Sequence, residues 1–321
     1  MRRTALPACR GLLLALLVTA LSAADDEVCI AYPDRPLFAR VASIIAEELP
    51  QHHPAQQLPL TAGQSLGDVL PANPGMLICL DNPVIEQALA LRRGRPALAE
   101  LPLIVGLGLN LRHHYGKQAA IAGVAYEMPL YNIVSEYSQL SSTPIHSVLT
   151  FYRGSQFTQS IADSTRQLER IGVQLKAIDV EAEGPDRESI LRTIRRLAPQ
   201  ACRDPTIDAV VLLNDNAILN EATLPLWQRL AQRRGLPFLG SLDRLIGDRQ
   251  PLCVYAAIPD HLQIGSQIAQ LAGFILQGEA SPAELGIEPL ISIDHIIHLT
   301  KARELSLQLT VPSRDDLTIR R

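Results

Sequence analysis

The sequence predicts an α/β protein made of two doubly wound parallel-sheet lobes joined by hinge strands. Apolar strand-like runs alternate with segments of helical spacing along the chain, which is typical of βαβ units. Residues 210–221 (VVLLNDNAILNE) pass from an apolar strand through three polar residues into a helix, and residues 76–86 (MLICLDNPVIE) repeat that order. The length of 321 residues suits two domains of ordinary size, so one chain with two like halves is expected.

The first 24 residues have the features of a cleaved export signal. Arg2, Arg3 and Arg10 form a basic lead, residues 11–21 are apolar, and residues 22–24 are small. The apolar run is too short to span a bilayer. The net charge of −4 disfavours a nucleic-acid partner, which would need a basic face. We therefore expect a soluble periplasmic protein.

The first lobe is expected over residues 25–124. Pro36 is placed to start a helix after the first strand, and the apolar residues that follow it have helical spacing. Strands are predicted at 27–31, 57–61, 76–80 and 101–107, and helices at 37–49, 66–70 and 83–93. Residues 110–122 are polar and predict an irregular loop or short helix. Residues 123–127 then form an extended segment that crosses to the second half.

The second lobe is expected over residues 125–321, where the alternation of strands and helices restarts. Strands are predicted at 146–151, 173–180, 208–213, 237–240, 252–256 and 290–299, and helices at 130–140, 156–171, 187–197, within 217–235, at 264–276 and at 300–305. The final strand and helix, about 290–307, are candidates for a return to the hinge or the first lobe.

Polar residues gather where the predicted strands turn into helices, the place where open α/β sheets bind ligands. We expect these corners to line a cleft between the lobes. They are residues 32–36, 81–82, 126–127, 152–155, 214–216 and 255–260.

Several segments of the second half, taken in order, resemble the ABC-transporter substrate-binding protein family that includes tryptophan- and tyrosine-binding members. These segments are residues 123–129, 148–155, 211–219, 235–241, 255–265 and 293–307. The resemblance implies a type I periplasmic-binding-protein fold whose two lobes close on a small ligand. By position it implies ligand contacts at Tyr152, Ser155, Asn214, Asp215, Asn216 and Tyr255 in the second lobe, and at Asp34, Asp81 and Asn82 in the first.

The chemistry of these corners has two interpretations. An Asp carboxylate can hold an ammonium group, Asn offers a donor and an acceptor, and a helix N-terminus behind the corner can accept a carboxylate, so the corners suit a zwitterion. Alternatively, Asp and Asn cap their own helices. Tyr32, Tyr126, Tyr152 and Tyr255 likewise either flank a flat ligand or pack at the lobe edges. Arg153 either binds a carboxylate or lies in solvent.

The four cysteines beyond the export signal permit two arrangements. Cys29 with Cys79 and Cys202 with Cys253 give one disulfide per half, which an oxidising compartment allows. Alternatively, several are buried free thiols, because cysteine in an apolar strand packs as a small hydrophobe. His295 and His298 lie on opposite faces of one predicted strand, which disfavours a shared metal ion.

The sequence favours a periplasmic solute-binding protein that closes on a small organic ligand and delivers it to an ABC-type permease. An amino acid or a similar polar metabolite fits the corners. The alternatives are a ligand-sensing subunit that docks on a membrane receptor kinase or cyclase, and a periplasmic enzyme. Nucleotide-binding, nucleophile-elbow and zinc motifs are absent from the sequence, so we expect no enzyme activity, no cofactor and no metal.

Overall fold

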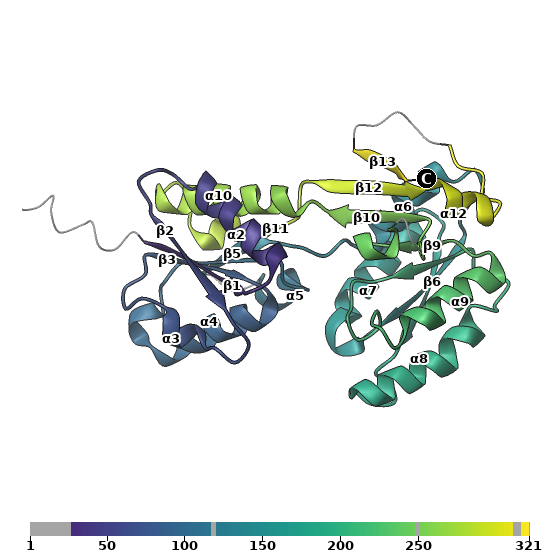
Figure 1. Cartoon of the computed structure of the whole chain (residues 1–321), viewed down its shortest axis with the longest axis horizontal. Helices are drawn as coiled ribbons and strands as arrows, with labels where there is room; N and C mark the ends of the chain where they lie inside the picture. The colour runs from purple at the N-terminus through teal and green to yellow at the C-terminus, as the bar shows by residue number, and fades with distance from the viewer. Residues whose placement is uncertain (1–26, 117–119, 248–250, 311–315, 321) are drawn as a thin grey trace, which may run out of the picture. The chain divides into compact units, whose positions relative to one another are not determined.

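The computed structural model describes residues 27–116, 120–247, 251–310 and 316–320, and the chain divides into two compact units. Unit 1 consists of the chain up to Ala125 and of His261–Pro289. Unit 2 consists of Tyr126–Asp260 and of the chain from Leu290 onward. Each unit is a mostly parallel sheet flanked by helices, which confirms the predicted fold class (Figure 1). The expected export signal, residues 1–24, lies outside the described residues.

Unit 1 has a six-stranded sheet of order β11-β5-β4-β3-β1-β2, in which every strand pairs in parallel. The strands are β1 (Val28–Pro33), β2 (Ala55–Leu60), β3 (Met76–Leu80), β4 (Leu103–Gly106), β5 (Ile121–Val124) and β11 (Ile287–Glu288). The helices are α2 (Pro36–Glu48), α3 (Leu66–Val69), α4 (Asn82–Gly94), α5 (Leu111–Tyr115), α10 (His261–Leu276), α11 (Pro282–Leu285) and the 3-10 turn η1 (Pro96–Leu98).

The four central strands of unit 1, β1, β3, β4 and β5, are apolar because helices cover both faces of the sheet (Figure 1). All five residues of β3 are buried. On one face, Val84, Ile85, Ala88 and Leu89 of α4 pack into a core with the side chains of β1 and β3. On the other face lie α2 and α10, which contact each other.

Unit 2 has a seven-stranded sheet of order β13-β12-β10-β9-β8-β6-β7, parallel except where β12 pairs with β10. The strands are β6 (Ser147–Tyr152), β7 (Gln174–Asp179), β8 (Ala209–Leu212), β9 (Phe238–Gly240), β10 (Tyr255–Pro259), β12 (Ile293–His298) and β13 (Leu317–Arg320). The helices are α6 (Leu130–Leu140), α7 (Gly154–Arg170), α8 (Arg187–Ala201), α9 (Leu224–Arg234), α12 (Leu299–Glu304) and the 3-10 turn η2 (Asp243–Leu245). Trp227, Phe151 and Phe238 lie in its main core.

The segment that returns to unit 1 is His261–Pro289, not the expected 290–307. Its helix α10 packs against α2 so closely that a Cβ on Gly265 would lie 3.0 Å from the Ile44 Cγ2 atom. Its strand β11 then extends the unit 1 sheet beside β5. By contrast β12, which begins at Ile293, pairs with β10 and stays in unit 2. The expected lobe boundaries, 25–124 and 125–321, therefore need this correction.

Within the described part of the chain, no helix has the length and apolar character needed to cross a membrane.

Candidate functional site

The carboxyl ends of the parallel strands carry most of the polar residues predicted to bind ligand. In unit 1, Asp34 follows β1, and Asp81 follows β3. In unit 2, Tyr152 ends β6, and Asn214, Asp215 and Asn216 follow β8. Because parallel strands end at the same edge of their sheet, each group forms a polar edge on its own unit.

Asp81 is the most unusual residue of the unit 1 edge. Its backbone has φ 81° and ψ 142°, a conformation that is strained for any residue other than glycine. Its Oδ1 atom accepts a hydrogen bond of 2.9 Å from the Asn82 N–H at the start of α4. Its Oδ2 atom makes no hydrogen bond to any residue that the structure describes. One carboxylate oxygen therefore remains available at a half-buried position.

Partial burial raises the pKa of Asp81, and the Asn82 N–H and the charge of Arg35 oppose that rise to a lesser extent. A carboxylate in this position lacks a full set of partners for its charge. A cation placed at the open oxygen would supply the missing compensation, because an opposite charge favours the ionised form. Asp34, which follows β1, is exposed and adds a second negative charge to the same edge.

Asn82 has a structural role. Its side-chain oxygen accepts a hydrogen bond of 2.7 Å from the Leu109 N–H, and its side-chain nitrogen donates one of 3.1 Å to the Leu109 carbonyl. These bonds fasten α4 to the loop after β4, in which Leu107 and Asn110 also have positive φ. Because the amide is engaged in this way, Asn82 shapes the edge and Asp81 is left as the stronger candidate for ligand contact.

The unit 2 edge is built around an ion pair between Arg153 and Asp215. The Nε atom of Arg153 lies 2.7 Å from Oδ2 of Asp215, whose side chain is fully buried. The Oδ1 atom of Asp215 accepts the Ala217 N–H at 2.8 Å. Asp215 therefore both caps the turn after β8 and holds Arg153. Its burial leaves it no surface for a ligand in this conformation.

The N-terminus of α7 is occupied by carboxylates of the protein itself. The Gly154 N–H donates to Oδ1 of Asp179 at 2.9 Å, and the Ser155 N–H donates to Oε2 of Glu181 at 2.7 Å. The Ser155 hydroxyl also donates to Glu181, at 2.9 Å. These contacts take the place that the sequence prediction gave to a ligand carboxylate. Ser155 accordingly positions Glu181 in this structure.

The unit 2 edge has an excess of negative charge. It carries three carboxylates, those of Asp179, Glu181 and Asp215, and one guanidinium group, that of Arg153, which pairs with Asp215 and whose Nη1 atom lies 4.0 Å from Glu181. The sequence prediction omitted Asp179 and Glu181 from the site. The available signal was that Asp179 and Glu181 lie at the end of the strand predicted at 173–180 and directly after it, and that strand pairs with the one that carries Tyr152.

Tyr152, Asn214 and Asn216 are predicted residues of this edge with accessible side chains. Tyr152 and Asn214 are half-buried, and Asn216 is exposed. None of the three side chains makes a hydrogen bond to another residue in the described part of the chain. Burial and the charge of Asp179 raise the pKa of Tyr152, so its hydroxyl is neutral at physiological pH and can donate a hydrogen bond.

Tyr255 does not contribute to the edge, contrary to the sequence prediction. It begins β10 instead of ending a strand, and it pairs with Leu239, in the middle of the sheet. The side chain is fully buried, and its hydroxyl lies 2.7 Å from Nδ1 of His295. Tyr126, the remaining predicted residue, is the first residue of unit 2 and is half-buried.

The four cysteines in the described residues, Cys29, Cys79, Cys202 and Cys253, are free and buried. This arrangement matches the free-thiol interpretation and not the pairing of one disulfide per half. Burial and the nearby charge of Glu27 raise the pKa of Cys29 to about 12, so this thiol is not ionised at physiological pH.

Comparison with known proteins shows what fold the two units form. No family model matches the chain, and no curated protein matches it. A ligand-free, open substrate binding protein with adhesive properties from Clostridium difficile has a TM-score of 0.64 at 11% identity, with 92% of this chain and 98% of that chain covered.

Two further structures extend the comparison. An ABC domain in complex with L-Trp from Streptococcus pneumonia has a TM-score of 0.58 at 15% identity, with 89% of this chain and 96% of that chain covered. A LacI transcriptional regulator from Rhodococcus has a TM-score of 0.54 at 12% identity, with 84% and 96% covered. At these identities the likeness shows the fold alone, and the chain has the two-unit α/β fold of type I periplasmic binding proteins.

Proposed function

We propose that this chain is an exported solute-binding protein that closes on a small organic ligand carrying a cationic group and delivers it to an ABC-type permease. The observation that carries the proposal is Asp81, a strained, half-buried carboxylate with one oxygen unpartnered among the described residues, at the carboxyl end of β3. Strained residues of this kind cluster at ligand sites, because a fold retains their cost only where other interactions compensate for it.

The charges at both edges favour the ammonium group of an amine or an amino acid over an isolated carboxylate. Among the described residues, Asp34 and Asp81 give the unit 1 edge two carboxylates against the one guanidinium group of Arg35. At the unit 2 edge, Arg153 already pairs with Asp215. In this proposal Asp81 accepts a charge-assisted hydrogen bond from the ligand ammonium, while Tyr152 and Asn214 supply neutral hydrogen bonds.

Ligand-driven closure follows from the division of these residues between two units. The chain passes from one unit to the other after Ala125, Asp260 and Pro289, so three connections link them. A ligand that contacts residues of both units stabilises the arrangement in which all the contacts form, and so shifts the population toward it. Such a closed form is what a permease would recognise.

A thermal-shift screen with amino acids, polyamines and uncharged metabolites tests the proposal. A ligand at about 100 times its dissociation constant should stabilise the chain by about 2.7 kcal/mol. Amines should raise the melting temperature, and the shift should fall in Asp81→Asn. This variant keeps a side-chain acceptor for the Asn82 N–H, and Asn has nearly the same shape as Asp, so the backbone strain is the same in both chains.

Glu47→Gln is the matched control for this screen. It removes one negative charge from an exposed position on α2 of the same unit and should bind ligand as the wild-type chain does. If no compound raises the melting temperature, or if the compounds that do so act equally on Asp81→Asn, the proposed function is refuted.

A further inference from the structure

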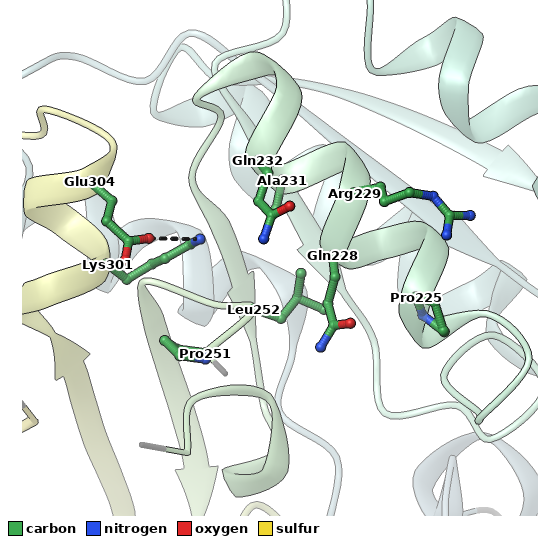
Figure 2. Close-up of a pocket in the computed structure, with 9 residues that line it drawn as sticks. All are labelled: Pro225, Gln228, Arg229, Ala231, Gln232, Pro251, Leu252, Lys301 and Glu304. Carbon is green, nitrogen blue, oxygen red and sulfur yellow. Dashed lines mark hydrogen bonds and ion pairs between the residues drawn. The ribbon is translucent and has the colours of Figure 1, made fainter. Parts of the chain in front are cut away.

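Unit 2 contains a pocket of about 470 Å³ that belongs to neither polar edge. It lies between α9, the segment before β10 and α12, and its walls include Gln228, Gln232, Leu252, Lys301 and Glu304 (Figure 2). The volume falls in the range of sites that hold small metabolites.

The pocket lies at the opposite edge of the unit 2 sheet from Arg153 and Asp215. Strand β12 runs antiparallel to β10, with Ile297 opposite Tyr255, the first residue of β10. Helix α12, which follows β12, therefore lies at the amino ends of the parallel strands, whereas Asp215 follows the carboxyl end of β8. The pocket is formed by unit 2 alone, so the inference drawn from it does not rest on the proposed function.

Lys301 is the buried charge of this pocket. Its side chain is only 6% exposed, and its ammonium points from α12 toward α9 (Figure 2). Among the described residues its one ion-pair partner is Glu304, whose Oε2 atom lies 3.2 Å away and whose side chain is 56% exposed. An ammonium has three N–H donors, so two have no partner within this part of the chain.

This single contact is weak compensation for a buried cation. An ion pair whose carboxylate is largely in water contributes little, because water competes for both groups and the side chains lose conformational freedom. Burying an ammonium is costly unless its charge is paired and its donors are hydrogen-bonded. The pocket thus offers a cation that is held loosely by a carboxylate from its rim.

We propose that this pocket binds a small organic carboxylate. The ligand carboxylate would replace Glu304 on the Lys301 ammonium, and the Gln228 and Gln232 side chains would donate to, or accept from, the polar groups of the ligand. We choose a carboxylate because Lys301 already binds one, that of Glu304. A ligand carboxylate would make the same contact and would leave the Glu304 side chain free to move in solvent.

Isothermal titration calorimetry of the full chain with succinate tests the proposal. Wild-type protein should bind succinate in the millimolar range. Glu304→Gln removes the competing carboxylate and should tighten binding about two- to fivefold, the range expected when an exposed ion pair no longer competes. Lys301→Met should weaken binding more than tenfold, because Met keeps the apolar stem but lacks the charge. Glu221→Gln, an exposed acidic position elsewhere in unit 2, should leave binding unchanged.

The opposite effects of the two pocket variants distinguish a ligand site from a structural ion pair. Loss of folding would weaken binding in both, and far-UV circular dichroism of Lys301→Met checks that it is folded. The proposal is overturned if succinate does not bind wild-type protein, if Lys301→Met binds it normally, or if Glu304→Gln binds it more weakly. Tighter binding of inorganic phosphate than of succinate would likewise contradict the assignment to carboxylates.

Discussion

Removal of the Arg153 side chain should destabilise unit 2 strongly, because it leaves Asp215 as a buried carboxylate without its countercharge. Breaking a buried ion pair from one side costs about 3–5 kcal/mol. The Arg153 side chain is 25% exposed, so water reaches the pair, and we expect a cost of about 2–3 kcal/mol for Arg153→Ala.

The reverse change should be milder. In Asp215→Asn, the amide oxygen still accepts the Ala217 N–H, and Arg153 turns toward Glu181 and solvent, so we expect a loss of about 1 kcal/mol. The double variant has no unpaired buried carboxylate and should therefore be more stable than Arg153→Ala alone. This order of stabilities is the signature of a buried carboxylate that needs its partner.

Urea unfolding followed by fluorescence measures these effects. The chain has one tryptophan, Trp227, and it lies in the core of unit 2. Arg195→Ala removes an exposed arginine from α8 of the same unit and should change stability by less than about 0.5 kcal/mol. Asp215 does not depend on Arg153 in this way if Arg153→Ala costs no more than Arg195→Ala, or if the loss of stability in the double variant equals the sum of the two single losses.

Three further predictions follow from unit 1 and from the cysteines. Asn82→Ala should cost about 2 kcal/mol in chemical unfolding, because it removes two hydrogen bonds to Leu109. Burial raises the pKa of Asp81, so the folded chain binds this proton more tightly than the unfolded chain. The resulting stability is present below the ordinary pKa of Asp, about 4, and is lost as the pH rises through the raised value. Without ligand, Asp81→Asn should therefore have a higher free energy of unfolding than wild type at neutral pH, and the two free energies should become equal below about pH 4. A difference in the free energy of unfolding that does not change with pH would contradict this. Thiol titration in denaturant should count Cys29, Cys79, Cys202 and Cys253 as thiols with or without prior reduction, and a higher count after reduction would reveal a disulfide.

The order of strands and helices could be predicted from the sequence, because apolar runs and helical spacing of apolar residues mark most of these elements clearly. Strand β3 occupies Met76–Leu80, as predicted, because five consecutive apolar residues end at a polar pair that starts a helix. Local sequence patterns predict less well which segments belong to which unit. Helix α10 covers the unit 1 sheet through contacts with distant residues, such as that of Gly265 with Ile44, and the spacing within α10 does not encode those contacts.

Prediction of the candidate site from the sequence was limited for the same reason, because the roles of its residues depend on contacts with residues far away in the chain. Sequence placed Asp215 at a polar corner, but its burial and its pairing depend on Arg153 in another strand-to-helix loop. The sequence predicts Asn82 as a ligand contact, but its side-chain amide makes two hydrogen bonds to the backbone of Leu109. For Tyr255, a shift of three residues in the start of β10 moved the side chain from the expected strand end to the middle of the sheet.

For Asp81, the sequence predicts a polar residue at the end of a strand, but it does not predict the backbone strain at this residue. Only the structure shows that φ is 81° at this residue. Two costs, the backbone strain and the partial burial of a carboxylate, meet at one residue of the unit 1 edge. A ligand cation would offset the second of them directly.

The proposed contact between Asp81 and a ligand cation is measured by the dissociation constant of the best amine from the screen. Calorimetric titration of wild type and Asp81→Asn at neutral pH compares the two chains. A charge-assisted hydrogen bond of about 1.5–3 kcal/mol predicts binding that is weaker by about 10- to 150-fold in Asp81→Asn. Equal dissociation constants in the two proteins would contradict the claim.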